Sequence, residues 1–215
     1  MMTLLLVKKD ILLAKKQTLL MLALSAIIPL FVVSRVPSLM GAVAFIYTVI
    51  FTEIIILQSI AAEEAKHPKA AALICAAPYS RKSFVIAKYV LFLLLFVYCY
   101  AIFNLVRIIN PNVGVIGLPV VLAVLLCGVT AYGVYLPLYF KYGFEKTKFF
   151  FMVTLFLIAF GTPMLVPYFA NIDVDFFMLS SIPTVALKIA LFLASIFVLC
   201  VSMAVSIRIY SRKDL

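Results

Sequence analysis

The amino-acid sequence predicts an all-α membrane protein with six transmembrane helices. Hydrophobic residues make up 67% of the 215 residues, and the mean hydropathy is +1.26, whereas a soluble domain is typically only about half apolar. The apolar runs are long and unbroken, whereas the strands of a membrane β-barrel alternate apolar with polar residues. Because backbone inside a bilayer must form its hydrogen bonds internally, these runs are expected to be helices.

Six of the apolar runs have the length of a membrane crossing, which takes about 20 helical residues. They define a transmembrane domain over residues 17–215, preceded by an N-terminal segment, residues 1–16. The expected spans are residues 17–33, 39–60, 83–106, 115–139, 149–169 and 183–207.

The N-terminal segment reads MMTLLLVKKDILLAKKQ and carries four lysines. Lys8 and Lys15 are seven residues apart, as are Lys9 and Lys16, so all four fall within one arc of a helix. Asp10 interrupts the pattern. This predicts an amphipathic helix in the inner membrane interface, with its lysines toward lipid phosphates. The alternative, that the lysines only flank and orient the first span, stays open.

The stretch between spans 2 and 3, IAAEEAKHPKAAALICAAPYSRKSFVIAKY, predicts a short helix outside the membrane. Pro68 suits the first turn of a helix, KAAALICAA favours helix, and Pro78 ends it, after which Ser80 can cap span 3. An apolar tip, Leu73 and Ile74, between charged flanks is typical of a docking surface. An ordinary polar loop is the alternative. The residues expected to form this surface are Glu63, Glu64, Lys69, Leu73, Ile74, Pro78, Arg81 and Lys82.

Between spans 5 and 6 the chain reads FGTPMLVPYFANIDVDFFMLSSIPT. Pro163 and Pro167 interrupt the end of span 5, and the piece that holds Asp173 and Asp175 is too short and too acidic to cross the membrane. We expect short re-entrant helices in the outer leaflet here, with an exposed outer loop as the alternative.

The charges predict an orientation. With both termini inside, only Arg35, Arg107 and Lys188 of the 18 lysines and arginines lie outside, and the other fifteen lie inside. Basic residues collect in cytoplasmic loops, so both termini and the stretch between spans 2 and 3 are expected to be cytoplasmic. The net charge of +10 is then explained by the lipid bilayer, without a nucleic-acid partner.

The sequence offers no catalytic, metal or cofactor site. Glu63 and Glu64 are like the paired glutamates of some intramembrane proteases, but Pro68 stands where that motif has arginine, and His67 is the only histidine, which is too few for a two-histidine site. No GxSxG elbow and no GxxxxGK[ST] loop is present. Any ATP would have to be hydrolysed by a partner.

Glu53 is the one carboxylate well inside an expected span. A charge at that depth costs about 2.5–3.5 kcal/mol on insertion scales, and such residues normally face a bundle interior or water. We interpret Glu53 as lining a translocation path or a subunit interface, with a role in packing as the alternative.

Four segments together resemble the permease subunits of type-2 ABC transporters. They are VKKDILLAKK near the start, APYSRKSFVIAKY before span 3, FKYGFEKTKFF between spans 4 and 5, and SIRIYSRKDL at the end. More narrowly, the chain is similar to the small six-span permeases of Gram-positive bacteria related to phenol-soluble-modulin and bacteriocin-resistance exporters.

The resemblance implies a multi-pass permease of the bacterial plasma membrane that is not itself an enzyme. It implies pairing with a second permease copy or paralogue, and an ABC ATP-binding subunit docked on the coupling helix between spans 2 and 3. It also implies export of a hydrophobic or amphipathic peptide, lipid or drug. A membrane-embedded protease and a stand-alone channel or secondary transporter are the alternatives.

Overall fold

The computed structural model describes residues 2–35, 42–66, 81–110, 113, 116–149, 152–153, 156 and 184–212. Every long element in this part of the chain is an α-helix, which confirms the all-α fold class. The elements are α1 (Met2–Leu13), α2 (Lys15–Arg35), α3 (Ala42–Lys66), α5 (Arg81–Ile109), α6 (Leu118–Tyr142) and α9 (Thr184–Ser211). A short helical stretch, residues 144–149, follows α6.

Four of the described helices, α3, α5, α6 and α9, are long and apolar enough to cross a membrane. A fifth crossing is counted if α1 and α2, which are bent by 88° relative to each other, form one broken span. The chain is therefore a multi-pass membrane protein. The expected span at residues 149–169 has no counterpart to compare with, because most of it lies outside the described residues.

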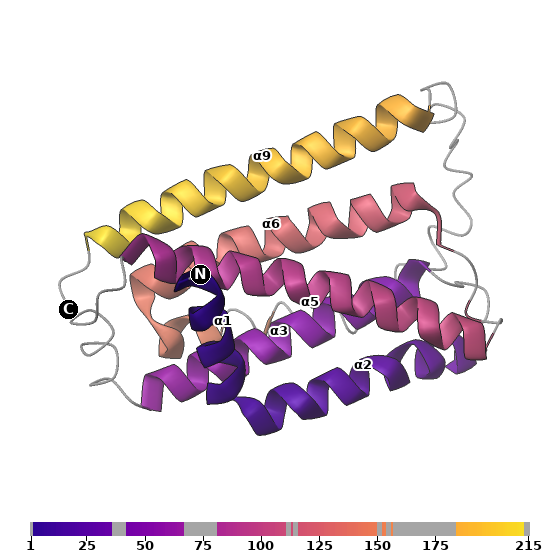
Figure 1. The fold of residues 1–215 in the computed structure, drawn as a ribbon, viewed down its shortest axis with the longest axis horizontal. Coiled ribbons are helices and arrows are strands. Elements are labelled where there is room, and N and C mark those ends of the chain that lie inside the picture. The colour runs from indigo at the N-terminus through magenta and orange to yellow at the C-terminus, as the bar shows by residue number, and fades with distance from the viewer. Residues whose placement is uncertain are drawn as a thin grey trace.

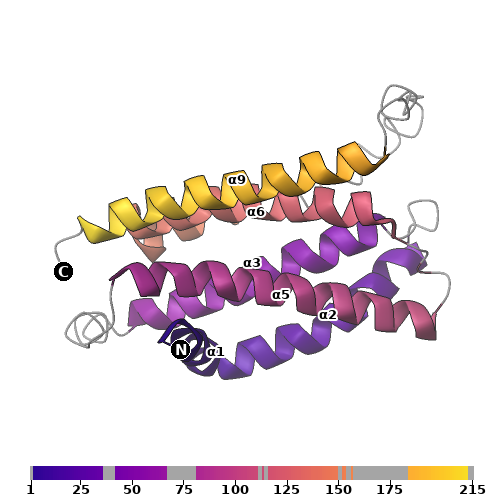
Figure 2. The same cartoon turned by 45° about the horizontal axis from the view of Figure 1, so that its top comes forward.

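The long helices form a bundle in which α6 and α9 lie side by side (Figures 1 and 2). Both run in the same direction, from the end of the bundle far from the N-terminus toward the end that holds both chain termini (Figure 1). The last residues of α3 and the first residues of α5 lie at that same end. The expected re-entrant helices between spans 5 and 6 lie outside the described residues.

Two glycines set the limits of α6, three residues later at each end than the sequence predicts. Gly117 is extended at the N-cap, and Pro119 follows in the first turn, where its missing N–H costs nothing. Gly143 has a φ of 80° and donates its N–H to the Tyr139 carbonyl, a left-handed conformation that glycine adopts readily. The resulting turn starts the helical residues 144–149.

The α6–α9 contact depends on small and polar side chains. A Cβ atom added at Gly133 would lie 3.2 Å from both Cβ and Oγ of Ser202, so the glycine permits the close approach. Ser202 donates a hydrogen bond to the Gly133 carbonyl at 2.7 Å. The Tyr89 hydroxyl of α5 lies 2.6 Å from Ser202 Oγ and 2.9 Å from Ser206 Oγ. Such residues hold membrane helices together where the hydrophobic effect cannot.

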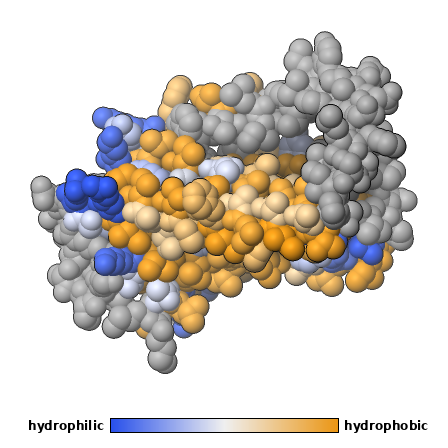
Figure 3. Space-filling model, turned by 90° about the horizontal axis from the view of Figure 1, so that it is seen from above, coloured by the Kyte–Doolittle hydropathy of each residue, from blue (hydrophilic) through white to orange (hydrophobic). Residues whose placement is uncertain are grey.

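Polar and apolar surfaces separate along the bundle. Figure 3 shows a hydrophobic belt, a larger group of hydrophilic residues at the left end of the view and a smaller group at the right end. Many large apolar side chains on α2, α5 and α9 are exposed, including Phe31, Val97 and Phe197, as expected of surfaces that face lipid. The belt agrees with a membrane protein.

Candidate functional site

Four charged side chains from three helices meet at the end of the bundle that holds the chain termini. They are Lys9 and Asp10 of α1, Glu64 of α3 and Lys88 of α5. Lys88 Nζ lies 2.9 Å from Asp10 Oδ2 and 2.9 Å from Glu64 Oε1. Lys9 Nζ lies 2.9 Å from Asp10 Oδ1 and 3.2 Å from Glu64 Oε1. Positive and negative groups thus alternate around a closed circuit, which we call the charge cluster.

The charge cluster is mostly buried. The side chains of Asp10 and Lys88 are each 2% exposed, that of Glu64 is 15% exposed, and that of Lys9 is 31% exposed. Two positive and two negative groups give no net charge. Each group has two partners of opposite sign, which is the condition under which buried charges are tolerated.

Aromatic residues connect the charge cluster to the remaining helices. The Tyr139 hydroxyl of α6 donates a hydrogen bond to Glu64 Oε2 at 2.9 Å. The Phe84 ring centre of α5 lies 5.1 Å from Lys9 Nζ and 5.3 Å from Lys88 Nζ, which is cation–π distance. The ring of Phe84 also stacks on Tyr210 of α9 at 5.3 Å. Helices α1, α3, α5, α6 and α9 therefore meet around one ionic centre.

Apolar packing holds α1 against this centre. Leu6, Val7 and Ala14 are buried in a cluster with residues of α3 and α5, including Ile60 and Leu91. On the opposite side, Leu4, Leu5, Lys8 and Leu12 are exposed. The placement of α1 in the membrane interface stays a prediction, but Asp10, which interrupts the amphipathic pattern in the sequence, is accounted for by its burial beside Lys88.

Sequence reasoning missed the charge cluster. The sequence places Lys88 among the fifteen basic residues of the inner side, although it lies two turns into α5, and it presents Asp10 only as an interruption of the lysine pattern. A usable signal is present in the sequence, since a lysine between apolar residues inside an expected span normally faces the bundle interior, where it pairs with an acid or a carbonyl. Nothing in the sequence alone identifies Asp10 on a separate helix as that partner.

The residues predicted to form the docking surface are only partly described. Glu63 accepts a hydrogen bond from Lys66 at 2.6 Å, Lys82 is exposed, and Arg81 is the first residue of α5. Glu64 instead directs its carboxylate into the charge cluster. Lys69, Leu73, Ile74 and Pro78, like the whole of residues 67–80, lie outside the described residues, so the coupling helix stays a prediction.

Glu53 lies inside the bundle and is 4% exposed. Its Oε1 atom is buried and has no hydrogen-bond partner among the described residues. Gly128 of α6 provides the space beside it, because an added Cβ would lie 3.7 Å from Glu53 Oε2 and 3.3 Å from Phe92 Cζ of α5. The acid therefore faces α5 and α6, and a path, an interface and a packing role are all compatible with this position.

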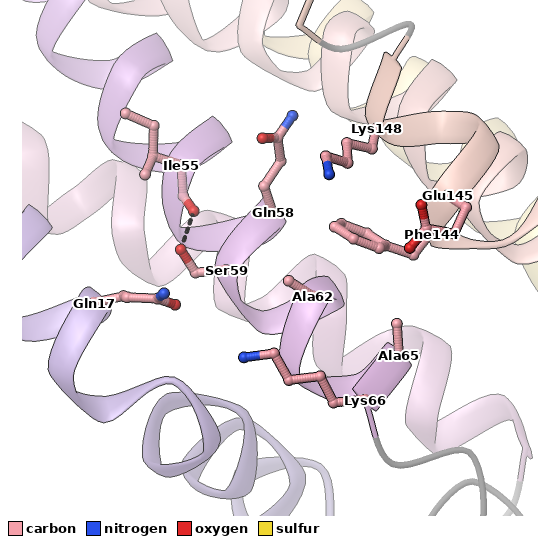
Figure 4. A pocket seen from close by; sticks show the side chains of 10 residues that line it. All are labelled: Gln17, Ile55, Gln58, Ser59, Ala62, Ala65, Lys66, Phe144, Glu145 and Lys148. Atoms are coloured by element: carbon pink, nitrogen blue, oxygen red, sulfur yellow. Dashed lines mark hydrogen bonds between the residues drawn. The ribbon is translucent and has the colours of Figure 1, made fainter.

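A separate cavity of about 450 Å³ lies on another face of α3 (Figure 4). Its lining mixes polar, charged and apolar side chains and includes no member of the charge cluster. The residues are Gln17, Ile55, Gln58, Ser59, Ala62, Ala65, Lys66, Phe144, Glu145 and Lys148. Lys66 is paired with Glu63, and the lining also holds one lysine and one glutamate, Lys148 and Glu145, so the cavity shows no clear preference for an anion or a cation.

Comparison with known proteins identifies one family. The model of a family described as "ABC-2 family transporter protein" matches residues 5–211. The match covers α1 to α9 and includes the whole charge cluster. No curated protein and no solved structure matches the chain significantly.

Proposed function

This chain belongs to the ABC-2 transporter family, and from that membership we propose that it is the permease subunit of an ATP-driven exporter. The observation that carries the proposal is the family match over residues 5–211, together with the apolar helices of a multi-pass membrane protein. Membership implies a transport component that works with an ATP-binding subunit. The sequence agrees with a separate ATPase, since it contains no GxxxxGK[ST] phosphate-binding loop.

We propose that this ATPase docks on the stretch between α3 and α5. In support, Lys66 ends α3 and Arg81 begins α5 at the end of the bundle where both termini lie. The proposed surface has Leu73 and Ile74 as its apolar centre, and a charged rim that includes Glu63 and Lys82. A central apolar anchor with a polar rim is the usual arrangement of a binding hot spot.

The proposed location is the bacterial plasma membrane, with both chain termini in the cytoplasm. Support comes from the distribution of charge along the bundle. The segments that carry fifteen of the 18 basic residues begin or end at the terminus-bearing end, whereas Arg35 ends α2 and Arg107 is near the end of α5, both at the far end (Figure 1). The positive-inside rule assigns the basic end to the cytoplasm.

The proposed cargo is a hydrophobic or amphipathic peptide, lipid or drug, as in the Gram-positive exporters that the chain resembles. The proposed complex contains two permeases, either two copies or a copy and a paralogue, and two ATPases. Glu53 would line the path or the permease–permease interface, and the outer segment between spans 5 and 6 would gate the exit. These assignments rest on the resemblance, because fold alone does not determine the cargo.

Inverted membrane vesicles provide a direct test. Vesicles from cells that express the chain with its ATPase are mixed with a fluorescent amphipathic helical peptide, and uptake is measured with ATP and with a non-hydrolysable analogue. The proposal expects uptake with ATP only, and only when both subunits are present. Uptake without the ATPase would indicate a stand-alone transporter, and cleavage of the peptide would indicate a membrane protease.

A further inference from the structure

Two members of the charge cluster lie on the helices that flank the proposed ATPase-docking stretch. Glu64 is two residues from the end of α3, and Lys88 is two turns from the start of α5. These are the two helix ends from which residues 67–80 depart. Any movement imposed on that stretch acts first on the helix ends that carry Glu64 and Lys88.

From this placement we propose that Asp10 and Lys9 are positioning residues that couple α1 to α3 and α5. When the docked ATPase moves the ends of α3 and α5, the ion pairs of Glu64 and Lys88 with Lys9 and Asp10 make α1 move with them. The inference rests on the proposed function, since it requires an ATPase at residues 67–80. In this proposal Lys9 and Asp10 act only through Glu64 and Lys88.

The ion pairs of the charge cluster can transmit a movement of α3 and α5 to α1 without leaving any charge unpaired. Lys88 touches one carboxylate on α1 and one on α3, and Glu64 Oε1 is shared by Lys9 and Lys88. If α1 slides against either neighbour and one contact lengthens, each charge keeps another partner of opposite sign. No bare charge is left in the interior, so the cost of an intermediate arrangement stays low.

Apolar packing alone would hold α1 less specifically. The contacts of Leu6, Val7 and Ala14 with the core are non-directional, and α1 is joined to α2 through an 88° bend. The ionic contacts, by contrast, connect named atoms at 2.9–3.2 Å. They are the contacts by which α1 can follow α3 and α5 rather than slip over them.

The test compares α1 movement in the permease–ATPase complex with and without the α1 charges. Spin labels are placed at Leu12 of α1 and Val205 of α9, which are 55% and 44% exposed, after the four native cysteines are changed to serine. The distance is measured by electron–electron double resonance in ADP and in ATP with orthovanadate. We expect the unmodified complex to show a shift of about 3 Å or more, within the range of helix movements in switching proteins.

The key variant is Lys9→Met/Asp10→Leu, which removes one charge of each sign and leaves the Lys88–Glu64 pair intact. We expect its nucleotide-dependent shift to fall to less than about a third of the unmodified value, while the amount of co-purified ATPase stays within about twofold. The charge-matched control is Glu145→Gln/Lys146→Met, whose side chains are exposed at the same end of the bundle and which should keep the full shift.

Lys9→Met provides a second, milder variant, because the Asp10–Lys88 contact remains. It should lower the shift to about half, and it serves if the double variant is not recovered from membranes. A full shift in either variant, or no shift of α1 in the unmodified complex, overturns the inference. Failure of any ATPase to co-purify with the unmodified permease would instead contradict the proposed function.

Discussion

Glu53 and Glu64 lie eleven residues apart on the same face of α3, but within the described part of the chain only Glu64 of the two has cationic partners. Eleven residues are three helical turns, or roughly 16 Å along the axis. Glu64 contacts Lys9 and Lys88 and accepts a hydrogen bond from Tyr139. Glu53 has one buried oxygen without a hydrogen-bond partner among the described residues. The two acids therefore have different physical roles, a paired structural charge and an unpaired polar group within the bundle.

The first prediction concerns Glu53. Glu53→Gln keeps the size of the side chain, so insertion and packing should be retained, whereas a role in the path or the permease–permease interface requires the acid. We expect at least a severalfold loss of ATP-dependent peptide uptake or of dimer yield, at equal expression. The comparison is with Gln58→Glu, which adds an acid elsewhere on α3. Unchanged uptake and unchanged dimer yield would assign Glu53 to packing.

The second prediction concerns the stability of the charge cluster. Lys88→Met leaves the buried carboxylate of Asp10 without its Lys88 contact, and removal of one member of a buried ion pair typically costs about 3–5 kcal/mol. Asp10→Asn/Lys88→Met removes one charge of each sign and leaves the Lys9–Glu64 pair, so its cost should be clearly smaller. Thermal unfolding in detergent measures both. An equal loss of stability in the two variants would mean that Asp10 and Lys88 do not stabilise each other.

The third prediction concerns the α6–α9 contact. Gly133→Ala should destabilise the bundle, because the added Cβ meets Ser202, which is itself held by hydrogen bonds to the Gly133 carbonyl and to Tyr89. Overpacking of this kind typically costs about 1–3 kcal/mol. Gly117→Ala is the control, because its nearest neighbour would be 3.5 Å away, an ordinary contact. A Gly133→Ala protein that unfolds at the unmodified temperature would contradict the tight packing.

The fourth prediction concerns topology. If the stretch between α3 and α5 is cytoplasmic, Cys75 should not react with a membrane-impermeant maleimide added to intact cells. The measurement uses a variant whose only cysteine is Cys75, and permeabilised cells confirm that the thiol is reactive. A cysteine introduced at Asn112, in the expected outer loop after span 3, is the positive control. Labelling of Cys75 in intact cells would show that the stretch between α3 and α5 lies outside the cell, opposite to the predicted orientation.

The all-α fold class and the multi-pass character could be predicted from the sequence because hydrocarbon imposes one strong rule, that long apolar runs become helices. The interior position of Glu53 followed from the cost of an exposed charge in lipid. These inferences depend only on neighbouring residues in the chain.

The charge cluster could not be predicted in the same way, because its members come from helices that are far apart in sequence. Asp10 and Lys88 are separated by 78 positions, and their pairing depends on how α1 folds back across α3 and α5 after the bend at Ala14. No local pattern specifies that bend angle. Glu64 illustrates the same limit, since the sequence alone does not distinguish an acid at a docking rim from an acid that faces inward.

The last prediction concerns the docking surface. Leu73→Asp or Ile74→Asp should release the ATPase from the permease, because an apolar anchor at the centre of an interface carries much of its binding energy and a buried unpaired carboxylate is costly. Both residues are predicted to lie outside the hydrocarbon, so the permease should still insert. The measurement is co-purification of the ATPase with the tagged permease, with an expected loss of tenfold or more.

Lys82→Ala is the matched comparison, because Lys82 belongs to the predicted rim and is exposed at the start of α5. Each rim charge contributes little to the binding energy and mainly affects the rate at which the two proteins associate. This change should therefore weaken association by only about twofold. Salt screens the exposed charges, and the difference between Lys82→Ala and the unmodified permease should therefore shrink as salt is added. Full co-purification with both aspartate variants would place the docking surface elsewhere, and the exposed face of α1, with Leu4, Leu5 and Lys8, would be the next surface to test.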